Sequence, residues 1–109
     1  MTATPRDRAL AFLLGEHGLL PVEAEEALAV AAPVLAEALS RLARAADDQN
    51  ARACAEAAHG LKGNLLNLGL AELAQTAEQA CAAARQGDLD PARRAAVTLR
   101  QALATLLPG

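Results

Sequence analysis

The sequence has almost none of the residues that favour β-strands. Ile, Tyr and Trp are absent, Phe12 is the only aromatic residue, and valine is found four times in 109 residues. β-Branched and aromatic side chains are enriched in strands because they pack well on a pleated surface. Alanine and leucine, which are among the strongest helix formers, fill 30 and 20 positions. The composition therefore predicts an all-α protein and argues against enzyme folds built on a sheet.

The net charge is small, and long apolar runs are absent. The net charge is −3 at pH 7, so no general attraction to nucleic acid or an anionic membrane is expected. No apolar run is long enough to span a bilayer, and Gly15 and Glu16 interrupt the brief apolar stretch that follows the charged N-terminus, which makes a poor signal peptide. We therefore expect a cytoplasmic protein that binds neither nucleic acid nor membrane.

Cysteine is limited to Cys54 and Cys81. Two thiols in a chain for which we expect no leader do not indicate a disulfide framework. Both fall on the apolar side of expected helices, so we interpret them as small buried hydrophobic side chains. A redox switch is the alternative.

Proline, glycine and capping residues divide the sequence into five expected helices. Thr4-Pro5, Asp47-Asp48 and Asp90-Pro91 are typical helix starts. The helices are expected over residues 5–14, about 21–46, 48–67, 70–86 and 90–107, with the last ending near Pro108-Gly109. Pro33 lies inside the second helix and is expected to kink it or split it in two.

The apolar residues of each expected helix recur at spacings of three and four, which is the pattern of one buried face. Because the connections between the helices are short, neighbouring helices are expected to run antiparallel. We therefore predict one domain over residues 1–109, an antiparallel up-down four-helix bundle with a short N-terminal cover helix.

Only two histidines are present, and they differ in their surroundings. His17 lies between Gly15 and Gly18 and is expected to be an exposed loop residue, without the further ligands that a metal site needs. His59 lies in the third helix, about 100° around the helix from Ala58. The apolar stripe of that helix consists of Cys54, Ala57, Ala58, Leu61, Leu65 and Leu68. His59 is therefore expected to face outward.

Two glycines lie next to His59 inside the expected helix, although alanine fills most small-residue positions in the helices of this chain. Glycine inside a helix costs roughly 1 kcal/mol relative to alanine, yet Gly60 and Gly63 flank the histidine where alanine is the usual choice. A missing Cβ lets another surface approach, and Lys62 supplies a positive charge suited to phosphate. A neutral imidazole is a competent nucleophile near neutral pH. The combination suits a histidine that accepts a phosphoryl group; an ordinary surface histidine beside a helix irregularity is the alternative.

Residues 59–63, His-Gly-Leu-Lys-Gly, with Gly69 ten residues after the histidine, resemble the motif of histidine-containing phosphotransfer (HPt) domains of multistep phosphorelays. The family pattern is His-x-Leu-Lys-Gly with a further glycine ten residues after the histidine, and the His, Leu, Lys and both Gly match. The fold of that family is a four-helix bundle with a short N-terminal cover helix. The resemblance therefore extends over nearly the whole chain.

The resemblance implies a role for each matching residue. His59 is the phosphoacceptor, and Lys62 stabilises the phosphoryl oxygens. Gly63 leaves room for the partner's active site, and Gly69 forms the turn into the next helix. The other residues expected at the binding surface are Gly60, Asn64 and Leu66.

The resemblance also implies what the protein does and with which partners. Family members have no kinase or phosphatase activity of their own. The implied function is a stand-alone phosphocarrier that accepts a phosphoryl group on His59 from a receiver-domain aspartate and passes it to another receiver. The expected partners are receiver domains of a hybrid histidine kinase and a response regulator. We expect no cofactor and no metal in this chain, since Mg²⁺ belongs to the receiver, and a monomer rather than a dimer.

Three features depart from the family pattern. Asn64, Leu65 and Leu66 stand where small residues are common. Leu65 fits the apolar stripe and is interpreted as core packing, and Leu66 is either tucked under a neighbouring helix or part of an apolar docking patch. Some members carry a glutamine 22 residues after the histidine, where this chain has Cys81. These departures leave a second hypothesis, a phosphotransfer-inactive interaction module that docks receiver or kinase domains. A third is a helical adaptor or dimerisation bundle unrelated to phosphorelays.

Overall fold

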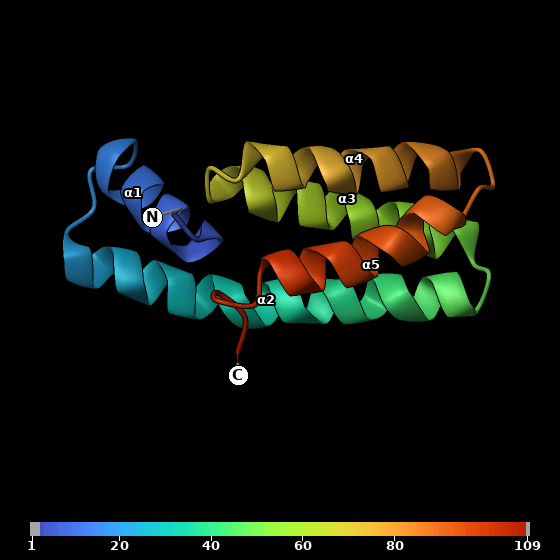
Figure 1. Ribbon diagram of the computed structural model, residues 1–109, viewed down its shortest axis with the longest axis horizontal. Coiled ribbons are helices and arrows are strands. Elements are labelled where there is room, and N and C mark those ends of the chain that lie inside the picture. The colour runs from blue at the N-terminus through green and yellow to red at the C-terminus, as the bar shows by residue number, and fades with distance from the viewer. Residues whose placement is uncertain (1–2, 109) are drawn as a thin grey trace.

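The computed structural model describes residues 3–108, and every regular element within them is a helix (Figure 1). The helices are α1 (Pro5–Gly15), α2 (Pro21–Asp47), α3 (Ala51–Asn67), α4 (Ala71–Arg85) and α5 (Asp90–Ala102). The prediction of an all-α fold is confirmed. Residues 1, 2 and 109 of the predicted domain lie outside the described residues.

Helices α2 to α5 lie along the long axis of the molecule, and α1 covers one end (Figure 1). Helix α3 packs against α2 and α4, and α5 packs against the same two helices, which closes a bundle of four; α1 contacts α2. The 27 residues of α2 correspond to about 40 Å of helix, close to the 43 Å length of the molecule. The predicted bundle with a short N-terminal helix is confirmed.

The core is built from leucine, alanine and the two cysteines. No polar or charged side chain between residues 3 and 108 is buried. Cys54 and Cys81 are free and buried, as predicted, and burial raises the pKa of the Cys54 thiol, which stays protonated at neutral pH. No helix in the described part of the chain combines the length and apolarity that a membrane span requires.

The third helix begins at Ala51 and not at residue 48 as predicted, whereas the fifth begins at the predicted Asp90. Helix α2 continues through Asp47, and Gln49 then adopts a φ of 55°. The N-cap of α3 is therefore Asn50, whose Oδ1 accepts a hydrogen bond from the Ala53 amide at 3.0 Å. Asp90 already lies inside α5 instead of capping it. For α3 the geometry of the turn at Gln49 decides which residue can reach the free amides of the helix.

Pro33 does not split α2, which is continuous from Pro21 to Asp47. The proline is exposed, and so is Ala29, whose carbonyl loses its helical partner and is free to bond water.

The predicted end of the fifth helix near Pro108-Gly109 is also wrong. Helix α5 ends at Ala102, although the apolar spacing of its sequence continues beyond that residue. The amides of Ala104 and Leu106 bond to carbonyls three residues earlier, at 3.3 and 2.9 Å, so the backbone tightens into turns. Pro108 further disfavours helical geometry at Leu107. Leu106 is still buried, so the apolar stripe reports burial here and not helical backbone.

Candidate functional site

His59 lies on the outer face of α3. Its neighbour Ala58 and the nearby Leu61 are 0% exposed, whereas the imidazole is exposed to solvent. The helix rotation is thus the one that the apolar stripe predicts. The buried leucines of α3 hold this rotation because turning the helix to bury His59 would bring Leu61 and Leu65 out of the core.

Gly60 and Gly63 leave open space beside the imidazole. Both are exposed, and a Cβ added to either would meet no atom within 4 Å. Packing inside this chain therefore does not require glycine at these positions, although both lower the intrinsic stability of α3. An open surface of this kind lets a second molecule approach His59 closely.

Replacing both glycines by alanine is expected to stabilise the protein. Each substitution removes a helix-interior glycine without a steric clash, for a gain of up to about 1 kcal/mol per site in the free energy of unfolding. Urea denaturation followed by circular dichroism measures the change. A loss of stability in Gly60→Ala/Gly63→Ala would show that the fold itself needs these glycines.

Lys62 is the only lysine in the chain, and its side chain reaches α4. Its Nζ donates a hydrogen bond to Oε2 of Glu78 at 3.0 Å, and the two side chains are 34% and 36% exposed. The hydrogen bond from Lys62 and then the lysine charge hold the pKa of Glu78 below its usual value, with smaller contributions from Arg85 and His59. The carboxylate is therefore ionised at neutral pH.

Glu78 is a residue of the site that the sequence analysis missed. It lies 16 residues after Lys62 on a different helix, and no spacing rule within one helix connects the two. The one sequence feature that could have pointed to Glu78 is its position beside the apolar stripe of α4, next to the buried Ala77. Only the packing of α4 on α3 brings it to the lysine.

Leu66 and Asn64 lie further along α3. Leu66 is 46% exposed, so the alternative in which a neighbouring helix covers it is wrong. Asn64 is partly buried and lines the groove between α2 and α3 together with Gly60 and Val34. Leu66 and Val34, which is 49% exposed, add apolar surface to this part of the molecule.

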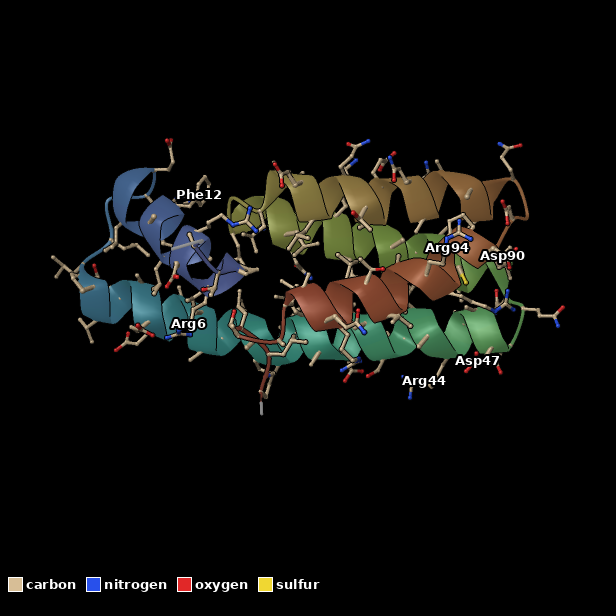
Figure 2. All side chains as sticks on the ribbon, viewed as in Figure 1. Arg6, Phe12, Arg44, Asp47, Asp90 and Arg94 are labelled. Carbon is tan, nitrogen blue, oxygen red and sulfur yellow. The ribbon has the colours of Figure 1, made fainter. Side chains whose placement is uncertain are left out.

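Gly69 forms the end of α3. Its φ is +72°, and the amides of Gly69 and Leu70 donate to the carbonyls of Leu66 and Leu65. These bonds form a Schellman motif, in which a glycine in the left-handed conformation closes the helix. Phe12 of α1 points toward this turn (Figure 2) and leaves no room for a Cβ on Gly69.

His17 lies in the loop after α1, where it is exposed, as predicted. Its ring stands edge-on to Phe12, with the ring centroids 5.2 Å apart. Cys81, 22 residues after His59, is buried, and its thiol donates to the carbonyl of Ala55 at 3.4 Å. The Cys81 thiol is thus turned to the backbone of α3.

His59 lies beside shallow open grooves and not inside a closed cavity. A groove of about 460 Å³ between α3 and α4 is lined by His59, Arg52, Glu56 and Arg85 with three alanines. Within residues 3–108 no cluster of three or more potential ligands could hold a metal ion. The site thus presents an exposed imidazole, with Lys62 three residues further along the same helix.

Comparison with known proteins gives one finding. The family model described as the Hpt domain matches residues 26–108, which is 83 of the 109 residues. The match includes α3, α4, α5 and most of α2, and it contains residues 59–69. No curated protein and no solved structure gives a match.

Proposed function

The chain belongs to the Hpt domain family, and from this membership we propose that it is a stand-alone phosphocarrier between two receiver domains, with His59 as the phosphoacceptor. Members of the family carry phosphoryl groups in phosphorelays, interact with receiver domains and are not enzymes. The observation that carries the assignment of the site is the exposed His59, with Lys62 one helical turn away and two glycines that the fold does not require.

The proposed transfer forms one bond and breaks one bond. The unprotonated ring nitrogen of His59 attacks the phosphorus of the receiver's aspartyl phosphate with its lone pair. The bond between phosphorus and the aspartate oxygen breaks, and the aspartate leaves as a carboxylate. Transfer to the second receiver is the reverse reaction with a new aspartate, and Mg²⁺ held by the receiver offsets charge on the phosphoryl oxygens.

Lys62 is proposed to stabilise the phosphoryl group after transfer. Its ammonium is a compact charge with three donors on a flexible stem, and it starts one turn from the imidazole. Exposed Leu66 and the open surface at Gly60, Gly63 and Asn64 are proposed to contact the receiver. Such an encounter is expected to bury a modest area and to be transient, which suits a carrier that must leave one partner for the next.

A two-receiver experiment tests this function. A receiver carrying ³²P on its aspartate is incubated with the protein, and a second receiver is then added. We expect the label to pass to this chain and then to the second receiver, and much more slowly between the receivers when the chain is omitted. Failure of the second receiver to gain label from the labelled chain would contradict the carrier role.

The alternative is a phosphotransfer-inactive module of the same family that docks receiver or kinase domains. It is favoured by the buried Cys81 in place of the glutamine that some members carry, since the Cys81 thiol bonds the Ala55 carbonyl. In that case the first receiver binds the chain but never labels it. Binding measured by titration calorimetry, together with the labelling result, separates the two functions.

A further inference from the structure

Lys62 is already engaged before any phosphoryl group is present. Its Nζ lies 3.0 Å from Oε2 of Glu78, and the pair joins α3 to α4 on the side of the bundle that carries His59. His59 lies three residues before Lys62 on α3, so its imidazole starts one helical turn from the lysine that pairs with Glu78. Both members of the pair are about one-third exposed, so an incoming group can reach them.

We propose that Glu78 is a positioning residue that holds Lys62 while His59 is unmodified and competes with the phosphoryl group for Lys62 after transfer. This inference rests on the proposed function of His59. In this role Glu78 weakens the interaction of Lys62 with the phosphoryl group on His59. Transfer of the phosphoryl group from His59 to a receiver is therefore more favourable in free energy than it would be without Glu78.

The competition follows from the donors that Lys62 can offer. Its ammonium can turn on its flexible stem toward a phosphoryl oxygen, but a hydrogen bond given to Glu78 is lost to the phosphoryl group. The carboxylate also repels the phosphoryl group as a like charge. Both effects raise the free energy of phosphorylated His59 relative to free His59. A phosphocarrier must release the phosphoryl group that it accepts, and a weaker interaction of this group with Lys62 favours transfer to the next receiver.

The ion pair between Arg8 and Glu72 provides a matched control. Glu72 lies on the same helix as Glu78 and also pairs with a cation of another helix, Arg8 of α1, at 3.9 Å. The substitution Glu72→Gln therefore makes the same change of charge on α4 as Glu78→Gln without touching Lys62.

The test uses phosphoramidate, a small phosphoryl donor, so no receiver is needed. The ring nitrogen of His59 attacks phosphorus, the P–N bond of phosphoramidate breaks, and ammonia leaves with the electron pair of that bond. With phosphoramidate and ammonia at fixed concentrations, ³¹P NMR gives the ratio of phosphorylated to free His59 at equilibrium. We expect Glu78→Gln to raise this ratio about two- to fivefold, the range of a partly exposed ion pair, and Glu72→Gln to leave it unchanged.

The same measurement in a Lys62→Gln protein separates competition for Lys62 from simple repulsion between the Glu78 carboxylate and the phosphoryl group. In Lys62→Gln protein the effect of Glu78→Gln is expected to shrink, because no ammonium remains to be shared. An equal increase in both backgrounds would overturn the proposal. Exposed His17 serves as an internal reference in the same sample, and a parallel rise of its phosphorylation would equally overturn a local role of Glu78.

Failure of the inference and failure of the proposed function give different results. If wild-type His59 is phosphorylated and Glu78→Gln leaves the ratio unchanged, Glu78 does not compete for Lys62, and the phosphocarrier function stands. If wild-type His59 takes no phosphoryl group while His17 does, both proposals are overturned. Far-UV circular dichroism of each variant excludes unfolding as the cause of any change.

Discussion

Gly69→Ala is expected to destabilise the protein by about 2–5 kcal/mol, a large share of the roughly 5–15 kcal/mol that stabilises a domain. Two independent effects add. At a φ of +72° a residue with a Cβ costs roughly 1–2 kcal/mol. The new Cβ would also lie 2.7 Å from Phe12 Cβ and overlap the Phe12 ring, and such overpacking costs typically about 1–3 kcal/mol. Urea denaturation gives the free energy of unfolding.

Gly87→Ala is the matched control for this prediction. Gly87 follows α4 with a φ of +83°, but a Cβ added there would meet nothing within 4 Å. It therefore reports the cost of the backbone conformation alone, roughly 1–2 kcal/mol. If Gly69→Ala is no more destabilising than Gly87→Ala, Phe12 does not pack over the turn, and the placement of α1 at that end of the bundle is wrong.

His59→Gln is expected to abolish phosphorylation by a labelled receiver while leaving the fold intact. The side chain is exposed and lies outside the core, so the substitution removes the nucleophile and little else. Glutamine keeps a polar side chain of similar size but has no nitrogen lone pair that can attack phosphorus. Autoradiography of the protein after gel electrophoresis measures the label, and circular dichroism confirms the helix content.

His17→Gln is the control for that result. His17 is the other histidine of the chain and is also exposed, but it lies in the loop between α1 and α2. Labelling is expected to be unchanged in this variant. Label that persists in His59→Gln and disappears in His17→Gln would assign the acceptor to the loop between α1 and α2 and contradict the proposed site.

The sequence predicts most of the fold because its signals are local. The spacing of alanine and leucine defines one face of each helix, and that face determines that His59 points outward. The same signals fail where two local rules compete. Asp47 can cap a helix, but α2 continues through it, and Asn50 is then the residue in reach of the α3 amides. Beyond Ala102 the apolar spacing continues while the backbone does not stay helical.

The parts of the site that could not be predicted depend on how one helix packs against another. The pairing of Lys62 with Glu78 requires the relative height and rotation of α3 and α4, which no spacing within either helix contains. The contact between Phe12 and the turn at Gly69 requires the position of α1 at the end of the bundle. The exposure of Leu66, left open by the sequence, likewise depends on which surface the neighbouring helices leave uncovered.

Mapping the phosphoryl group on the wild-type protein shows directly whether His59 carries it. After incubation with a phosphorylated receiver, the protein is digested at alkaline pH, and the modified peptide is located by mass spectrometry. We expect an alkali-stable, acid-labile phosphoramidate on His59 and none on His17. Phosphate found on any other residue, or as an acid-stable ester, would contradict it.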